Sequence, residues 1–157
     1  MSAPQSVTVV VPAFNEGLAV GDVVRRIIET MTSTGEPFEV IVVDDGSSDE
    51  TARGARDGGA MVISHPQNAG YGAALKTGIT RARYDHIVIT DADGTYPIDR
   101  IPDLIVHADR FDMVVGARTG ANYRESWFKE PARINLGAMV EWVTGTSIPD
   151  VNSGLRV

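Results

Sequence analysis

The chain has 157 residues, 43% hydrophobic and 22% charged, which suits a globular domain with a sizeable core. A net charge of −7 excludes a surface that follows a nucleic-acid backbone, because phosphate would be repelled. The absence of cysteine excludes disulfides, thiolate catalysis and zinc-thiolate sites. No apolar run approaches the roughly 18 residues needed to span a bilayer.

Short apolar runs alternate along the chain with patterns of helical spacing. The runs are β-branched and mostly continuous, as strands buried on both faces should be, and cover residues 7–11, 40–43, 61–63, 86–89 and 113–115. Helical spacing is visible over residues 20–31 and 101–108, and a helix is also expected over about residues 128–144. This alternation predicts an α/β fold, with a Rossmann-like, mostly parallel sheet flanked by helices on both faces.

The distinctive polar residues follow the predicted strands. In parallel sheets, ligands bind beyond the carboxyl ends of the strands. Those ends are followed here by residues 12–16, 44–48, 65–70, 91–95 and 116–118. The layout therefore predicts a single site at one edge of the sheet.

Asp91-Ala92-Asp93 places two carboxylates directly after an apolar run. Carboxylates at this spacing suit Mg²⁺ or Mn²⁺, which bind through one or two carboxylates together with substrate phosphates. The pattern by itself is common, and its weight comes from the segments before it.

The segment 44–50 predicts a strand end, a glycine turn and a helix start. Ser47 and Glu50 fit a capping box, which leaves Asp44 and Asp45 unexplained. Asp45 either accepts hydrogen bonds from a ribose or a base N–H, or belongs to the turn. In the first loop, Asn15 fits a cap of the first helix, and Glu16 either favours its dipole or contacts a ligand.

Residues 68–74 form a glycine-rich entry to a helix. Such a loop either presents backbone N–H groups to an anion or lets the helix pack closely on the sheet. The three histidines, His65, His86 and His107, show no ligand spacing and are interpreted as structural or surface residues.

Arginines and aromatic residues of the second half leave two further alternatives open. Arg118, Arg133 and Arg156 either bind a phosphate or are solvated charges. A guanidinium group suits a phosphate because it is planar and bidentate. Trp127, Phe128 and Trp142 lie near one face of the helix expected over residues 128–144, which fits either a membrane interface or core packing.

Taken together, these segments resemble glycosyltransferase family 2, which has the GT-A fold, and most closely its polyprenyl-phosphate sugar transferases of the dolichyl-phosphate mannose synthase type. Any one segment is weak evidence, but the ordered set is highly specific. The matching segments are residues 9–16, 42–51, 68–78, 91–93, 115–118 and the Asp-x-x-Ser-Gly-x-Arg segment at 150–156.

The resemblance implies a role for each matching residue. The residues that would line the nucleoside pocket are Pro12, Phe14, Glu16, Val43 and Asp45. Asp91 and Ala92 would contact the nucleotide sugar, and Asp93, with Asp91, would hold Mg²⁺ or Mn²⁺. Arg118 would hold the acceptor phosphate together with Arg133 and Arg156, and the implied catalytic residues are Asp91, Asp93 and Arg118.

The implied activity is inverting, metal-dependent transfer of a sugar from a UDP- or GDP-sugar to a polyprenyl phosphate. The expected partners are this donor and this lipid, without nucleic acid, while peripheral membrane contact and a homodimer are left open. The expected location is the cytoplasm, with the inner face of the membrane left open. A single GT-A domain is expected over residues 1–157, truncated at its C-terminus because related chains run further.

Three alternatives accompany this expectation. In the first alternative, the acceptor is a saccharide hydroxyl, with Asp150 as the one candidate base. In the second, the domain binds a nucleotide sugar without turnover. Residues 89–95 also resemble the first motif of haloacid-dehalogenase-type phosphatases, but that motif normally follows the first strand. The chain departs from the related synthases at Thr95, where those often carry glutamine.

Overall fold

A computed structural model of the chain describes residues 6–117 and 153–157. The chain divides into two compact units, Met1–Val114 with Gly154–Val157, and Val115–Ser153. All helices and strands described below belong to the first unit. Of the second unit, the described residues are 115–117 and Ser153, whose hydroxyl donates a hydrogen bond to the carbonyl of Gly116 at 2.6 Å. The single domain over residues 1–157 stays a prediction.

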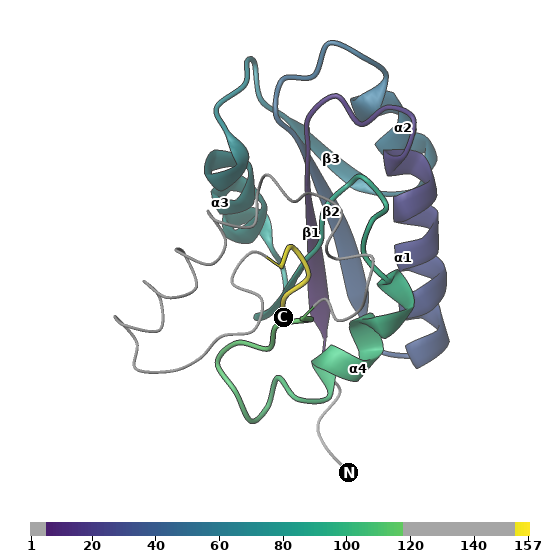
Figure 1. Cartoon of the computed structure of the whole chain (residues 1–157), viewed down its shortest axis with the longest axis vertical. Coiled ribbons are helices and arrows are strands. Elements are labelled where there is room, and N and C mark those ends of the chain that lie inside the picture. Colours follow the sequence, from purple (N-terminus) through teal and green to yellow (C-terminus); the bar gives the residue numbers. More distant parts are fainter. Residues whose placement is uncertain (1–5, 118–152) are drawn as a thin grey trace, which may run out of the picture. The chain divides into compact units, whose positions relative to one another are not determined.

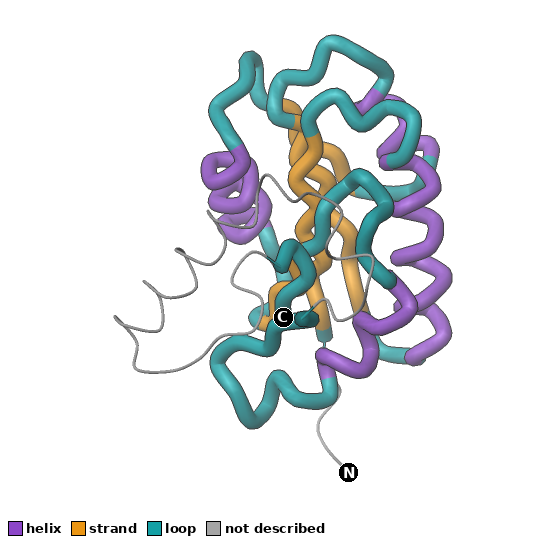
Figure 2. Tube along the Cα trace, in the orientation of Figure 1, coloured by secondary structure: helices purple, strands orange, loops and turns teal. Residues whose placement is uncertain are grey.

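The first unit is built on a four-stranded parallel sheet, which Figure 2 shows in orange. Its strands are β1 (Val7–Ala13), β2 (Phe38–Asp44), β3 (Met61–Ser64) and β4 (His86–Ile89), in the order β3-β2-β1-β4. In the register of β1, Val9 lies between Val40 and Val88. β1 is buried along its whole length, which explains its continuous apolar run.

Helices cover both faces of this sheet, as predicted (Figure 1). One face carries α1 (Val20–Thr34), α2 (Thr51–Asp57), the 3₁₀ helix η1 (Ile98–Arg100) and α4 (Ile101–Ile105). The side chains of Val9, Val11 and Val42 join Val24 and Ile27 of α1 in the larger core cluster.

The other face carries α3 (Tyr71–Arg81), above a smaller cluster of Ile41, Val43 and Ala74. Gly78 lets this helix approach closely, since a Cβ there would lie 2.4 Å from Cγ1 of Val10. Gly78 lies beyond the glycine-rich residues 68–74, so this contact does not decide between the two alternatives for that segment.

The prediction of a fifth strand over residues 113–115 is wrong. Val114 instead exchanges two backbone hydrogen bonds with Val157, at 2.8 and 2.9 Å. Arg156 pairs with Ile89 in an isolated antiparallel bridge, so the C-terminal residues lie beside β4. A local pattern of apolar residues does not reveal such a return of the chain, because pairing partners are set by the tertiary fold. Likewise, α4 ends at Ile105, three residues before the end of the predicted helix at residue 108.

In the described part of the chain, no helix combines the length and apolarity that a membrane span requires. The helix expected over residues 128–144, with Trp127, Phe128 and Trp142, lies outside the described residues. Its two interpretations therefore both stay open.

Candidate donor-binding site

The order of the strands predicts where a ligand binds. From β1 the chain moves to β2 and β3 on one side, and then returns to β4 on the other side of β1. Such a reversal opens a crevice beyond the carboxyl ends of the strands. A cavity of about 380 Å³ lies at this place, lined by Pro12, Ala13, Phe14, Glu16, Asp45, Asn68, Tyr71, Ala74, Asp91, Ala92 and Asp93.

This cavity brings together residues from four separate segments of the sequence. The lining residues that were predicted from the sequence are Pro12, Phe14, Glu16, Asp45, Asp91, Ala92 and Asp93. Val43 differs, because its side chain is fully buried and packs with Ala74 beneath α3. Val43 therefore supports the cavity lining and is not part of it. The roles assigned to these residues stay predictions.

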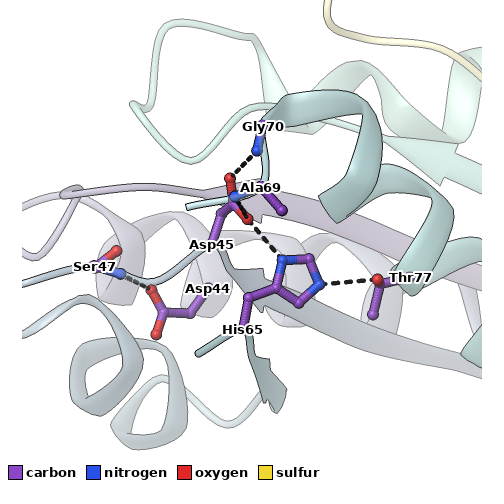
Figure 3. A network of polar contacts seen from close by, with 7 residues as sticks. All are labelled: Asp44, Asp45, Ser47, His65, Ala69, Gly70 and Thr77. Atoms are coloured by element: carbon purple, nitrogen blue, oxygen red, sulfur yellow. Dashed lines mark hydrogen bonds and ion pairs between the residues drawn. The ribbon is translucent and has the colours of Figure 1, made fainter. Parts of the chain in front are cut away.

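One end of the cavity is lined by the buried carboxylate of Asp45, whose polar contacts are shown in Figure 3. Its Oδ1 accepts hydrogen bonds from Nδ1 of His65 at 2.6 Å and from the amide of Ala69 at 3.0 Å. Its Oδ2 accepts one from the amide of Gly70 at 2.7 Å. The N–H groups of the glycine-rich loop thus bind an anion, but this anion is the protein's own carboxylate.

The charge state of Asp45 follows from these contacts. Burial raises the pKa of Asp45, but the hydrogen bonds from Ala69, His65 and Gly70 outweigh it and leave the pKa below 3.8. The carboxylate is therefore ionised at neutral pH and only accepts hydrogen bonds. Nδ1 of His65 therefore donates to this carboxylate, and Nε2 lies 2.9 Å from the hydroxyl of Thr77.

The loops after β1 and β2, which both contribute to the cavity lining, are cross-linked by hydrogen bonds. Asn15, in the left-handed region with φ of 56°, accepts a hydrogen bond from the amide of Ser48 at 2.9 Å. Its own amide donates to the hydroxyl of Ser47 at 2.9 Å. The amide of Glu16 donates to Oγ1 of Thr51 at 2.8 Å. These contacts fix the two loops that line the cavity.

These cross-links overturn two turn predictions. Asn15 does not cap the first helix, because α1 begins only at Val20 and the side chain of Asn15 binds the other loop. Ser47 and Glu50 do not form a capping box, because the hydroxyl of Ser47 accepts the amide of Asn15. In both cases a contact between loops replaced the local one that the sequence pattern predicts.

The other end of the cavity carries Asp91 and Asp93. Asp93 Oδ1 accepts hydrogen bonds from the amide and the hydroxyl of Thr95, at 2.9 and 2.7 Å. Asp91 Oδ1 accepts one from the hydroxyl of Tyr71 at 3.3 Å. The departure at Thr95 thus has a structural consequence, since this residue orients Asp93.

The acidic side chains at this end repel one another. Burial, and then the charges of Asp93, Asp49 and Asp91, raise the pKa of Glu16 above 4.5. Burial, and then the charge of Asp91, raise the pKa of Tyr71 to about 12, so that its hydroxyl remains a hydrogen-bond donor. A cation bound between these carboxylates would relieve the repulsion.

The donor set fits a hard divalent cation. Among the described residues, no group of three or more His, Cys, Asp or Glu side chains can hold a metal ion by itself. Mg²⁺ and Mn²⁺ need no such group when one or two carboxylates and substrate phosphates coordinate them. Both described hydrogen bonds of Asp93 use Oδ1, so Oδ2 would be the oxygen that holds a cation.

Sequence reasoning missed several residues of this site. Asn68 and Tyr71 line the cavity but were assigned only to a glycine-rich loop. His65 was interpreted as structural or surface, and it contacts Asp45 directly. The one indication of these residues in the sequence was a tyrosine next to a glycine-rich loop. Contacts between loops cannot be recognised from residue spacing.

Two of the three predicted acceptor arginines, Arg118 and Arg133, lie outside the described residues. Arg156 pairs its backbone with Ile89 and lines a second cavity, of about 420 Å³, with residues such as Ile79 and Phe111. Its positive charge also slightly opposes the upward shift in the pKa of Tyr71.

Comparisons with known proteins agree on the ancestry of the chain. It is 32% identical over 158 residues to an undecaprenyl-phosphate 4-deoxy-4-formamido-L-arabinose transferase of Edwardsiella ictaluri (strain 93-146), covering 97% of this chain and 48% of that protein. It is 33% identical over 156 residues to the protein of the same name from Proteus mirabilis (strain HI4320), covering 96% and 48%. The chain spans about half the length of these curated relatives.

Solved structures of glycosyltransferases share the fold. A glucosyl-3-phosphoglycerate synthase of Mycobacterium tuberculosis, crystallised with Mn²⁺, UDP and glucosyl-3-phosphoglycerate, matches with a TM-score of 0.72 and 26% identity. The match covers 97% of this chain and 56% of that one. Mannosyl-3-phosphoglycerate synthase from Rubrobacter xylanophilus matches with a TM-score of 0.76 at 18% identity, covering 97% and 52%. The predicted GT-A fold is confirmed.

The family comparison covers nearly the whole chain. Residues 8–151 match the family described as Glycosyl transferase family 2. This match includes residues 89–95 and excludes the phosphatase alternative. The chain belongs to glycosyltransferase family 2.

Proposed function

We propose that this chain carries the donor site of an inverting, metal-dependent glycosyltransferase that moves a sugar from a nucleoside diphosphate to a polyprenyl phosphate. One observation carries the proposal. A single cavity joins the buried acceptor Asp45 to the paired carboxylates Asp91 and Asp93. These two ends suit the two ends of a nucleotide sugar, its nucleoside and its diphosphate.

The nucleoside would bind at the Asp45 end. Asp45 offers an ionised acceptor to a ribose hydroxyl or a base N–H. Phe14 lines the same cavity and its side chain is partly exposed, so it offers an aromatic face to a base. Base stacking on aromatic side chains contributes about 1–3 kcal/mol per base in nucleic-acid-binding proteins.

The diphosphate would bind at the other end, where Asp93 and Asp91 would hold Mg²⁺ or Mn²⁺ together with the donor phosphates. When bound, such a cation neutralises negative charge on the diphosphate leaving group. The hydroxyl of Tyr71 orients Asp91, and Thr95 orients Asp93. The synthase from Mycobacterium tuberculosis was crystallised with both Mn²⁺ and UDP, which supports this arrangement.

The reaction itself needs little proton transfer. An oxygen of the acceptor phosphate forms a bond to the anomeric carbon of the sugar. The bond from that carbon to the diphosphate breaks, and its electron pair leaves with the nucleoside diphosphate. Attack from the opposite face inverts the configuration. Because the second pKa of a phosphomonoester is about 6, the acceptor is largely ionised at neutral pH and requires no strong base.

The acceptor class is supported by the names of the curated relatives, which are transferases acting with undecaprenyl phosphate. Arg118, Arg133 and Arg156 are the proposed contacts to the acceptor phosphate. A lipid acceptor also implies work at a membrane surface, and the proposal therefore includes peripheral contact with the inner face of the membrane.

Isothermal titration calorimetry with UDP and GDP, each with and without Mn²⁺, tests the donor site. Metal-dependent binding of one of them is expected, and its absence with both would contradict the proposal. Transfer from the matching nucleotide sugar to a polyprenyl phosphate in detergent then tests the acceptor. Transfer only to a saccharide hydroxyl would replace the acceptor, and binding without any transfer would favour the non-catalytic alternative.

A further inference from the structure

Most hydrogen-bond acceptor positions of the Asp45 carboxylate are occupied by groups of the protein itself. A carboxylate offers about four acceptor positions, two on each oxygen. In the described part of the chain, Oδ1 accepts from Nδ1 of His65 and from the amide of Ala69, while Oδ2 accepts from the amide of Gly70. One position, on Oδ2, is left for a ligand.

The surroundings of Asp45 prevent the carboxylate from presenting both oxygens. Its side chain is only 4% exposed although it lines the cavity, so a ligand reaches a small part of it. Rotation of the carboxylate would break the hydrogen bonds to the two loop amides and to His65, and unpaired buried groups are costly.

His65 is itself held from the far side. Its imidazole lies between Asp45 and Thr77 of α3, as Figure 3 shows, with Nε2 at 2.9 Å from the hydroxyl of Thr77. The ring is 15% exposed. A hydroxyl from a helix, an imidazole and a carboxylate thus form one chain of hydrogen bonds, which ends at the cavity.

The nucleobases differ in the donors that they offer to such a carboxylate. Uracil presents a single N–H, at N3, between two carbonyl oxygens. Guanine presents adjacent N–H groups, at N1 and N2, which pair well with both oxygens of a carboxylate at once. A site that leaves one of these donors unpaired in a buried place discriminates against that base.

We propose that His65 is a positioning residue that occupies Oδ1 of Asp45 and thereby selects a donor with a uracil-type base over one with guanine. The inference rests on the proposed function, because it concerns the nucleoside end of the same donor site. It adds a preference for one nucleobase. The residue types that line the cavity do not by themselves determine this preference.

The test compares base preference in the wild-type chain and in variants of His65, by calorimetry with Mn²⁺. The ligands are UDP, GDP and UDP methylated at N3, which lacks the single donor. Wild type is expected to bind UDP at least about tenfold more tightly than either of the others, the effect of one lost hydrogen bond in a buried site. Equal binding or a preference for GDP would overturn the choice of base, and so would full affinity for the methylated ligand.

His65→Ala removes one of the two hydrogen bonds to Oδ1 and leaves a second acceptor position of Asp45 for a ligand, so the preference for UDP over GDP is expected to narrow to about threefold or less. His65→Asn keeps an N–H donor near the place of Nδ1 and is expected to restore the preference. An unchanged preference in His65→Ala would overturn the role of His65.

Thermal unfolding followed by circular dichroism accompanies each titration. A merely structural role of His65 would lower the melting temperature of both variants and leave the ratio of affinities unchanged, which also overturns the proposal. Failure of wild type to bind any of the three ligands would instead contradict the proposed function, and the two failures are therefore distinguishable.

Discussion

The two ends of the cavity hold their carboxylates in opposite ways. Asp45 is buried and accepts three hydrogen bonds from described groups, which keep its pKa low. Glu16, Asp91 and Asp93 lie close enough to one another that burial and their charges raise the pKa of Glu16. At the first end the protein supplies hydrogen bonds that favour the charged carboxylate, whereas at the second burial and neighbouring negative charges disfavour the charged form of Glu16.

Under the proposed function, this difference would separate recognition of the base from binding of the metal within one site. A carboxylate fixed by the fold can distinguish between ligands, because its geometry costs nothing to organise on binding. Carboxylates that repel one another favour a cation and become more stable when it binds. We therefore expect substitutions at the first end to change stability and base preference, and those at the second to change dependence on metal.

The largest effect is expected for Asp93→Asn at the metal end. Loss of a ligand charge should weaken UDP binding in the presence of Mn²⁺ by about 100-fold, since even outer partners of metal ligands contribute about 10–100-fold. Binding without metal should hardly change, and calorimetry measures both. Asp57→Asn, an exposed carboxylate at the end of α2, is the matched control. Equal losses with and without Mn²⁺ would argue against a metal role.

Asp45→Asn should lower the free energy of unfolding by about 2 kcal/mol at pH 7, because the amide cannot accept all the buried hydrogen bonds. The folded-state pKa of Asp45 lies below the ordinary value of 3.8. Its stabilisation is thus fully present above pH 3.8 and is lost as the pH falls through the folded value. Urea denaturation from about pH 7 down to about pH 3 should show the two proteins converging, and a constant difference would contradict the assignment.

Gly154→Ala tests the packing behind Asp91. A Cβ at Gly154 would lie 2.3 Å from Oδ2 of Asp91 and 2.9 Å from the ring of Tyr96. We expect a loss of about 1–2 kcal/mol in urea denaturation, together with weaker metal-dependent binding of UDP. Gly72→Ala in α3, where a Cβ would meet nothing within 4 Å, should be neutral or slightly stabilising. Similar behaviour of both variants would refute the close approach at Asp91.

The smallest effect is expected for Glu16→Gln, and its sign is opposite to that of Asp45→Asn. The folded-state pKa of Glu16 is raised above 4.5, so its ionisation costs stability as the pH rises from 4.5 through the folded value. The variant should gain less than about 1 kcal/mol at pH 7, because solvent screens a partly exposed group. The gain should vanish below pH 4.5 and shrink when Mn²⁺ is present. A loss of stability at neutral pH without metal would contradict this sign.

The sequence predicted those features of the structure that depend on a local requirement for one type of residue. Four of the five predicted β-branched runs became β1 to β4. β1 is buried along its whole length, as a continuous apolar run predicts, whereas the edge strands β3 and β4 are only partly buried. The cavity lies at the sheet edge where the site was predicted, since parallel strands bring their carboxyl ends together. Asp45, Asp91 and Asp93 follow such ends and line one cavity.

Tertiary structure decided what depends on contacts between distant segments. Nothing in residue spacing indicates that Arg156 pairs with Ile89, or that Asn15 and Ser47 bind across two loops and not within one helix cap. Nor does it indicate that His65 and two loop amides occupy Asp45. Sequence alone therefore determined the family and the fold class, and it predicted the acidic residues that line the cavity. The folded chain determined which oxygens of that site are left for a ligand, because hydrogen bonds between loops form only when the sheet brings those loops together.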